Sequence, residues 1–513
     1  MFNKQLRLVN TVKFLKPIQI YYRLYYFGRN RANKLLSKEA PLFKISKSTP
    51  LKLQESLHII NCYTSDKNFT FLNLNKKFED KIDWNYNGYG KLWTYNLTYF
   101  DYLSQKNIEG ESLVNDFIEN INLVNDGLEP FPISLRGINW IKYLTYNNIK
   151  NKKIDDSLYA QYYILLDSLE YHLLGNHLLE NGFSLLFGAY YFKDEKLYKH
   201  AKKILVSELN EQVLDDGGHF ELSPMYHQIM LFRVLDCLNL IKNNKWKNQE
   251  LLKLFTQKAE IMLGWLKQIS YKDGMIPLFN DSSNKIAPTT YQLNTYADRL
   301  ELHPQVINLK SSGYRKFTDD DFELFVDVGE VGASYIPGHA HSDTFNFELS
   351  LKEKPFIVDT GLSTYETCSR RSFERSTSAH NTVEINSKNQ SDVWGGFRVA
   401  NRASIIALDE DSTFIKATHN GYEKEGILHT RKWEVNSDKI IIEDYLTKEV
   451  NSIARFHFHP SITEDEILER INLEKIDYKI SSYMYSPEFN TQKEAKVLEV
   501  SFNQSLKIII SIF

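Results

Sequence analysis

The sequence predicts an α+β multidomain protein, in which an α-helical domain is followed by an antiparallel β domain. The spacing of apolar residues supports this order, because it changes once along the chain. From about residue 50 to residue 305, apolar residues recur at steps of three and four, the period of amphipathic helices. From about residue 320 they alternate with polar residues, the period of β-strands. The length of 513 residues agrees with this division, since one ordinary core does not grow so large.

Residues 1–45 form a basic, aromatic segment of their own. Residues 1–38 contain nine Lys or Arg and no Asp or Glu, although the whole chain has a net charge of −3. The segment lacks the continuous apolar stretch and the small-residue cleavage site of a signal peptide. Two interpretations stay open: an arm packed on the protein's own acidic body, or a peripheral contact with an anionic membrane surface. We expect a cytoplasmic or membrane-peripheral protein, with a periplasmic location as the alternative.

Residues 46–312 are expected to form the helical domain. Stretches such as DDSLYAQYYILLDSLEYHLL (155–174) and HQIMLFRVLDCLNLIKNN (227–244) carry the helical period. Several amphipathic helices of similar length in series predict paired helices packed in layers. The chain shows no strict repeat of the solenoid kind.

Residues 313–513 are expected to form an antiparallel β-sandwich domain. FELFVDVG (322–329) and FNFELSL (345–351) each place four apolar side chains on one face. Further alternating runs follow to the end of the chain, and turn residues separate them at short intervals. A cleft between a helical and a β domain is a natural place for a long substrate.

The start of the β domain contains a cluster of candidate metal ligands. His339 and His341 lie two residues apart, Asp359 closes the next apolar run, and His380 precedes another alternating run. A hairpin could bring Asp359 beside His341. Two imidazoles and one carboxylate suit Zn²⁺ in a three-ligand site with one open position. The alternative is a set of separate histidines that are hydrogen-bonded at strand ends.

The helical domain contains two further polar clusters. GNHLLENGF (175–183) places Asn176, His177 and Glu180 inside an otherwise apolar helix, which is costly unless these groups are satisfied or functional. GGHFELSPMYHQ (217–228) gathers polar side chains around a Gly-Gly turn and a Ser-Pro helix start, namely His219, Glu221, Tyr226 and His227. Each cluster alone could be a capping or core hydrogen-bond network.

Arg136 lies between apolar residues in SLRGINWIKYL (134–144). A buried arginine without a partner is expensive, so we expect it to pair with a carboxylate or to meet an anionic ligand. We group Arg136 with Glu180 and His227 as candidate substrate-binding residues.

Several of these motifs occur together between about Trp93 and Arg431: LWTYNLTYFDYL, RGINW, NHLLENG, GHFELSPMYH, GHAHSDTFNFELS, IVDTG, RSTSAHNTVEIN and HTRKW. In this combination the chain resembles the heparinase II/III-like family of polysaccharide lyases, which includes heparinase-type and alginate lyase-type enzymes. The resemblance implies an incomplete (α/α) toroid followed by an antiparallel β-sandwich. It also implies eliminative cleavage of a uronate-containing acidic polysaccharide, and zinc in the β domain.

The resemblance also implies roles for individual residues. Asn176, assisted by His177, would neutralise the C6 carboxylate of the uronate. Tyr226 would protonate the leaving oxygen, and for one sugar configuration it would also take the C5 proton. His339 would be the base for the other configuration. Glu180 would orient His177 or touch the substrate, and the zinc ligands would be His341, Asp359 and His380.

Two other functions stay open at this point. A glycoside hydrolase on the same scaffold would need two carboxylates that flank the scissile bond, and Glu180 and Glu221 are the candidates. A non-catalytic glycan-binding or assembly factor for polysaccharide biosynthesis would not require the set of Asn176, Tyr226 and His339.

The composition argues against two further classes of site. The three cysteines are scattered and form no disulfide framework or CxxC pair. The body is acidic and carries no fingerprint for nucleic-acid or phosphate binding, so we expect no nucleic-acid partner.

Overall fold

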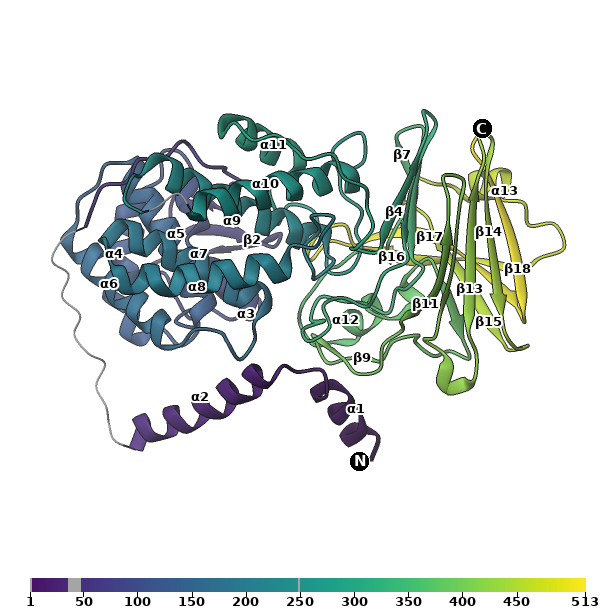
Figure 1. Ribbon diagram of the computed structural model, residues 1–513, viewed down its shortest axis with the longest axis horizontal. Helices are drawn as coiled ribbons and strands as arrows, with labels where there is room; N and C mark the ends of the chain where they lie inside the picture. The colour runs from purple at the N-terminus through teal and green to yellow at the C-terminus, as the bar shows by residue number, and fades with distance from the viewer. Residues whose placement is uncertain (1, 36–47, 248–249) are drawn as a thin grey trace.

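The computed structural model of the chain describes residues 2–35, 48–247 and 250–513. A helical body and a β body lie side by side, and two N-terminal helices lie beneath them (Figure 1). The predicted fold class, a helical domain followed by antiparallel sheets, is confirmed. The boundary expected at residue 45 lies outside the described residues. The last helix of the helical domain ends at Arg299, and the first large sheet begins at Tyr314.

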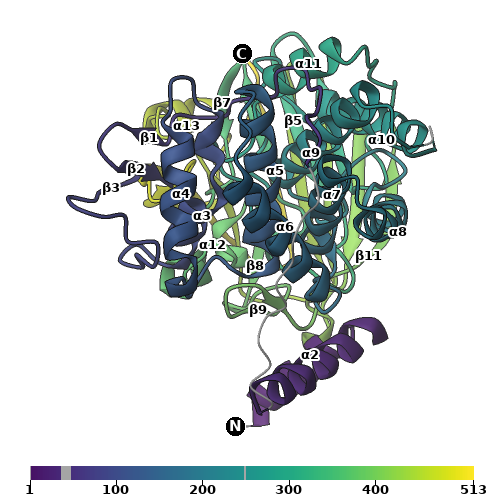
Figure 2. The same cartoon turned by 90° about the vertical axis from the view of Figure 1, so that its left-hand side faces the viewer.

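The helical domain is built around α7, of which every residue except His177 is buried. Side-chain caps start several of its helices, since Asn151, Asp194 and Ser223 each accept a hydrogen bond from a backbone N–H of the first turn. Neighbouring helices run side by side in Figure 2 and form an incomplete toroid. Their bounds are α3 (Lys91–Tyr99), α4 (Gly110–Asn120), α5 (Pro130–Tyr146), α6 (Lys152–Asp167), α7 (Gly175–Phe192), α8 (Glu195–Gln212), α9 (Pro224–Asn243), α10 (Glu250–Ile269) and α11 (Thr290–Arg299).

The helical prediction from residue 50 onward is wrong for residues 63–77. This stretch forms a small antiparallel sheet of β1 (Tyr63–Thr64), β2 (Asn68–Phe71) and β3 (Leu74–Lys77). Its two turns have positive φ at Asp66 and Lys67 and at Leu72 and Asn73. Two consecutive left-handed residues give the tight hairpin turn that matches strand twist. Turn geometry therefore decides this segment, and the apolar spacing does not.

The β domain contains three main antiparallel sheets. One has the order β11-β12-β13-β14-β18, a second β16-β17-β15-β8, and a third β4-β5-β6-β7. The strand bounds are β4 (Tyr314–Thr318), β5 (Phe322–Asp327), β6 (Phe347–Leu351), β7 (Lys354–Ile357), β8 (Val383–Ile385), β9 (Val393–Trp394), β10 (Arg398–Val399), β11 (Ile405–Glu410), β12 (Phe414–His419), β13 (His429–Val435), β14 (Lys439–Leu446), β15 (Ser452–His457), β16 (Asp477–Tyr485), β17 (Lys493–Phe502) and β18 (Ser505–Ser511), with the short helices α12 (Ser369–Glu374) and α13 (Glu464–Arg470) between them.

Strand β5 joins the two domains, and all six of its residues are buried. Phe322, Leu324 and Val326 belong to the core of the β domain, as the alternation predicts. Phe325, on the opposite face, belongs to the core of the helical domain and packs edge-on against Tyr271. A strand that is buried on both faces fixes the two bodies against each other. It thereby fixes the loops that leave this sheet next to the first turns of α7 and α9.

The basic N-terminal segment forms helices α1 (Phe2–Val12) and α2 (Pro17–Leu35). Helix α1 contacts the β domain through the ion pair of Arg7 with Asp392. Helix α2 contacts the helical domain, where Gln19 donates to the carbonyl of Leu173 and Tyr26 to that of Leu169. None of the described helices is long and apolar enough to cross a membrane.

Candidate active site

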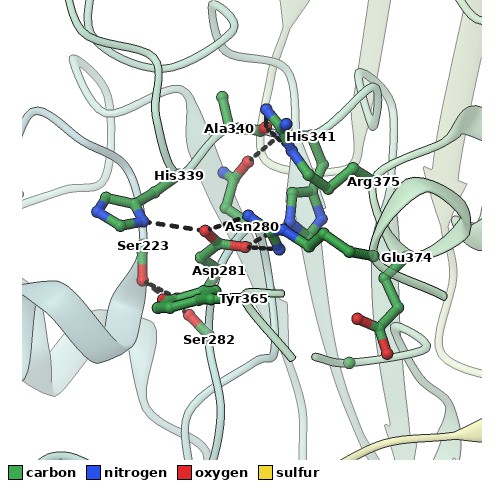
Figure 3. A network of polar contacts seen from close by, with 12 residues as sticks. Ser223, Asn280, Asp281, Ser282, His339, Ala340, His341, Tyr365, Glu374 and Arg375 are labelled. Carbon is green, nitrogen blue, oxygen red and sulfur yellow. Dashed lines mark hydrogen bonds and ion pairs between the residues drawn. The ribbon is translucent and has the colours of Figure 1, made fainter. Parts of the chain in front are cut away.

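The candidate site lies where the first turns of α7 and α9 meet the loop between β5 and β6. The loop carries His339 and His341, and both imidazoles bond the same carboxylate (Figure 3). Asp281 Oδ2 lies 2.9 Å from Nδ1 of His339, and Asp281 Oδ1 lies 2.8 Å from Nε2 of His341. Arg371 pairs with Asp281 through both of its terminal nitrogens. Asp281 thus holds three cationic or polar groups in one arrangement.

Asp281 is ionised in this setting. Burial alone would raise its pKa, but Arg371 and the two imidazoles hold the pKa well below its usual value. A carboxylate can only accept, so His339 donates its Nδ1–H to Asp281. Nε2 of His339 then carries the lone pair. Asp281 therefore fixes both the orientation and the tautomer of this histidine.

Tyr226 lies directly on His339. The ring centroids are 3.9 Å apart, and the planes are inclined by 29°. Tyr226 stands in the first turn of α9, because Ser223 caps that helix and Pro224 occupies its first position. Its hydroxyl lies 3.3 Å from the hydroxyl of Tyr365. Burial raises the pKa of Tyr226 above its ordinary value, so the phenol keeps its proton at neutral pH.

Asn176 completes the contact between the two domains. Its side-chain Nδ2 lies 2.8 Å from Oε2 of Glu221 and 3.4 Å from Nε2 of His339. Its backbone N–H also donates to Glu221 at 3.1 Å. Gly175, which precedes it, has φ +59°, and a Cβ there would lie 2.8 Å from Oε1 of Glu221. A glycine is therefore required for Glu221 to reach the start of α7.

His177 is the solvent-facing member of the group, with 36% of its side chain exposed. Its Nδ1 lies 3.0 Å from Glu170. Burial lowers the pKa of His177, but the charge of Glu170, its hydrogen bond to His177 and the charges of Glu221 and Glu180 together raise the pKa overall. The first turn of α7 thus carries an amide and an imidazole with a raised pKa at consecutive positions. The structure therefore brings together Asn176, His177, Tyr226 and His339 from three separate places in the sequence.

The three candidate substrate-binding residues lie elsewhere, and their assignment is corrected here. Arg136, Glu180 and His227 are each 0% exposed. Arg136 donates to the carbonyls of Thr98 and Gly127, and no carboxylate among the described residues pairs with it. Burial lowers its pKa to about 9.

Glu180 and His227 also have structural partners. Glu180 pairs with Arg233 at 3.1 Å, so it does not orient His177, which bonds Glu170 instead. His227 bonds the carbonyl of Met262 at 3.0 Å and packs on Trp265, and burial lowers its pKa to about 3. Polar residues inside apolar helices are either functional or held by the core, and these three are held by core partners. Nη2 of Arg136, Oε2 of Glu180 and Nδ1 of His227 nevertheless have no hydrogen-bond partner among the described residues.

The candidate zinc ligands are close together and fully buried. The rings of His341 and His380 lie 5.2 Å apart, and His380 Nδ1 lies 2.8 Å from Asp359. Nδ1 of His341, Nε2 of His380 and Oδ2 of Asp343 have no hydrogen-bond partner in the described part of the chain. Burial lowers the pKa of His341 to about 4, which leaves it neutral. These donor types suit Zn²⁺.

The arrangement of these donors is nevertheless not that of a finished metal centre. Asp359 accepts from His380 and, at 2.6 Å, from Asn346. No group of three or more His, Cys, Asp or Glu side chains among the described residues is placed to hold an ion. The donor chemistry therefore fits zinc, while the spatial arrangement gives it no common centre.

The sequence gives no indication of three residues at this site. Asp281 and Tyr365 lie in irregular loops and Arg371 in a six-residue helix, where apolar spacing carries no information. Glu221 is singled out in the sequence as part of the polar cluster at 217–228 and as a hydrolase carboxylate, but not as the partner of Asn176. A single Asp in FNDSSN carries no signal of its own, and its partners lie 58 or more residues away.

Comparison with known proteins gives two family models that match this chain. The model of the heparinase II/III N-terminus matches residues 157–310, and that of the heparinase II/III-like C-terminal region matches residues 302–505. Heparin-sulfate lyases of Bacteroides stercoris and Pedobacter heparinus are each 26% identical over 43% of this chain. The alignments span only 37% and 38% of those relatives. A crystal structure of heparinase III superposes with a TM-score of 0.67 at 15% identity, over 96% of this chain and 91% of that one.

Proposed function

Because the chain belongs to the heparinase II/III-like family, we propose that it is a lyase that cleaves a uronate-containing acidic polysaccharide by β-elimination. The glycosaminoglycan class is the first candidate substrate, since two relatives are heparin-sulfate lyases. The observation that carries the proposal is the stack of Tyr226 on His339 beside Asn176. A phenol and an amide that both contact one imidazole are the groups that elimination at C5 and C4 requires.

Neutralisation of the C6 carboxylate is the first requirement. The C5 proton of a uronate is a weak acid, and its removal puts negative charge on the carboxylate oxygens. The Asn176 amide donates hydrogen bonds, and His177 beside it, whose pKa is raised, supplies positive charge when it is protonated. Glu170 keeps that charge in place. Both groups sit at the N-terminus of α7, where the helix dipole also favours an anion.

Proton removal and proton donation are the second requirement. His339 turns Nε2 away from Asp281, and this nitrogen can accept the C5 proton. The Tyr226 phenol keeps its proton at neutral pH and can give it to the C4 oxygen as the bond breaks. Because the two rings are stacked, one bound sugar can meet both groups. In the opposite C5 configuration, Tyr226 is proposed to serve as base and acid in turn, for which the phenol must first give up its own proton and react as the phenolate.

The hydrolase alternative needs two carboxylates at the substrate, and one of its two candidates is buried in the core. Glu180 is 0% exposed and paired with Arg233, so it cannot reach a glycosidic oxygen. Glu221 accepts hydrogen bonds from Asn176. Without Glu180, the pair of carboxylates that a hydrolase needs is incomplete. A binding or assembly factor without catalysis stays the second candidate, and the assay below distinguishes it.

We also propose that His341, Asp359 and His380 hold Zn²⁺. The support is the two unpartnered, buried imidazole nitrogens and the neutral state of His341. When bound, the ion would pin the loop that carries His339, and no catalytic step proceeds through it. Metal analysis of the purified protein tests this proposal: zinc near one equivalent is expected, falling in His380→Ala. Absence of zinc after growth in zinc-supplemented medium would contradict it.

The lyase proposal is tested by ultraviolet absorbance during incubation with heparan-type chains, chondroitin, hyaluronan and alginate. An unsaturated uronate absorbs, so a rise on one polymer is expected for the native protein and for Tyr291→Phe, an exposed control tyrosine. Tyr226→Phe should abolish the rise and keep polymer binding. New reducing ends without absorbance would indicate a hydrolase. Binding without either signal would indicate a binding factor.

A further inference from the structure

Helix α2 presents two opposite faces of different character. Gln19, Tyr22, Tyr26 and Arg29, spaced by three and four residues, contact residues 167–173 of the helical domain. Ile20, Leu24, Phe27 and Arg31 follow the same spacing on the other side, and all four are exposed. Leu24 is 67% exposed and Phe27 57%. The apolar face of this amphipathic helix therefore points to solvent, whereas a helix of a globular domain buries that face.

Helix α1 extends the same surface. Leu6, Leu8, Val9 and Val12 are exposed, although α1 is tied to the β domain by Arg7 and by Thr11, which accepts from the Trp394 indole. Ten of the 26 large apolar side chains that are exposed in the described residues lie between Leu6 and Phe27. Scattered apolar side chains are normal on a surface, but such a concentration marks an interaction site. We name this surface, formed by α1 and α2, the N-terminal face.

The charge of the N-terminal face has one sign. Residues 1–38 carry nine Lys or Arg and no acidic residue. Some of these charges are neutralised by the body, as in the pairs of Lys16 with Glu211 and Arg29 with Asp167. Arg23 and Arg31 have no carboxylate partner among the residues that the structure describes. Arg31 lies over the ring of Phe27 at 4.2 Å, on the exposed side of α2.

We propose that the N-terminal face docks on the surface of an anionic lipid bilayer. Apolar side chains flanked by Arg and Lys, with Tyr at the same level, are what a helix needs to lie in the headgroup region. The proposal is compatible with the contacts between α2 and residues 167–173 of the helical domain, because these contacts use the opposite face of α2. Under this proposal the two interpretations of the segment are compatible, one for each face of α2.

A second copy of the chain is the less favourable occupant. Two N-terminal faces in contact would bring together two sets of like charges, with no carboxylate in either segment to compensate. An anionic bilayer offers the complementary charge. Figure 2 shows α2 projecting away from the rest of the molecule, so a flat surface can reach it.

Docking would also set the position of the candidate active site. Gln19 and Tyr26 hold the carbonyls of Leu173 and Leu169, in the segment that carries Glu170 and leads into Asn176. Helix α1 at the same time contacts the β domain beside Trp394. The N-terminal face therefore spans both domains, and a bilayer bound to it would hold the enzyme near a polysaccharide made or exported at that membrane.

The experiment is co-sedimentation of the full chain with lipid vesicles. Vesicles of phosphatidylcholine with 30% phosphatidylglycerol should bind about tenfold more protein than pure phosphatidylcholine vesicles, and salt should weaken the binding. Leu24→Glu/Phe27→Glu should lower binding about tenfold or more. The matched control Val306→Glu/Leu408→Glu changes two exposed apolar residues elsewhere and should bind like the native protein.

A charge variant makes the test complete. Arg23→Gln/Arg31→Gln keeps the apolar face and should remove most of the preference for anionic vesicles. Each variant is checked by its thermal midpoint, which should be unchanged because the altered side chains are exposed. Equal binding of Leu24→Glu/Phe27→Glu and native protein would overturn the proposal. A native dimer that Leu24→Glu/Phe27→Glu converts to monomer, with no vesicle binding by either, would assign the face to a second copy and overturn it as well.

Discussion

The phenol ring of Tyr226 lies on the imidazole of His339, with the ring centroids 3.9 Å apart. Tyr226 belongs to α9 of the helical domain and His339 to a loop of the β domain, so the pair exists only because the two domains meet here. Asp281 bonds Nδ1 of His339, and the side-chain amide of Asn176, on α7, lies next to Nε2. The proposed chemistry depends on this four-residue contact, and the first two predictions below change its members one at a time.

The loss of kcat should depend on the C5 configuration of the sugar when His339 is replaced, but not when Tyr226 is replaced. Tyr226→Phe removes the proposed acid and should lower kcat on every cleaved polymer by about 10²–10⁴-fold. His339→Ala removes the base for one C5 configuration only. It should lower kcat by a similar factor on glucuronate-rich or on iduronate-rich chains, but not on both. Steady-state rates on the two kinds of heparan-type chain measure this, and equal losses by His339→Ala on both would contradict the division of roles.

Asp281 should be a positioning residue for His339. Asp281→Asn lets the side chain donate to Nδ1, so His339 can place its proton on the wrong nitrogen, and kcat should fall by about 10²-fold or more with little change in KM. Buried Arg371 also loses its charge partner, which should lower the free energy of unfolding by about 3 kcal/mol. Kinetics at a temperature well below the unfolding midpoint separates the two effects. A change confined to stability would show that Asp281 is only structural.

His177 should set the basic limit of activity. Its pKa is raised above its ordinary value by Glu170, so its positive charge is present at low pH and is lost as pH rises through that raised pKa. Glu170→Gln removes the carboxylate, lowers the pKa of His177 and should move the basic limb of the kcat/KM profile to lower pH. Glu119→Gln, an exposed change elsewhere, serves as control. An unmoved basic limb in Glu170→Gln would exclude His177 from the titration.

Arg136 should matter for folding and not for substrate. Arg136→Met leaves the carbonyls of Thr98 and Gly127 and the amide oxygen of Gln161 without their donor in the core. The free energy of unfolding should fall by about 3 kcal/mol or more, since each buried group that loses its partner costs about 1–3 kcal/mol. KM for the polymer should stay unchanged at temperatures where the variant is folded. A rise in KM without loss of stability would restore Arg136 as a binding residue.

The sequence predicts the fold class well, because the change of apolar period reflects burial directly. FELFVDVG becomes β5, and its alternating residues face two different cores. Residues 63–77 escape the prediction because backbone turns with positive φ, and not apolar spacing, decide that hairpin. The two N-terminal helices are amphipathic, yet spacing alone cannot tell that their apolar face is the exposed one.

The residues of the candidate site, like the fold, could be predicted from the sequence only in part. The family motifs single out Asn176, Tyr226 and His339, and the structure brings them into contact. Asp281 could not be predicted from the sequence, because the partners that define its role, His339 and Arg371, are distant from it in the chain. Glu180 and His227 follow the same polar-in-apolar pattern as Asn176, and only their partners show that they serve the core.

Cleavage in water labelled with heavy oxygen, followed by mass spectrometry of the fragments, tests the central claim most directly. Elimination breaks the C4–oxygen bond without adding water. The account predicts fragments without the label, half of them lighter by one water at a new unsaturated end, and none of these from Tyr226→Phe. Fragments that carry the heavy oxygen at a new reducing end would show hydrolysis, and the assignment of Tyr226 and His339 as an eliminating pair would be wrong.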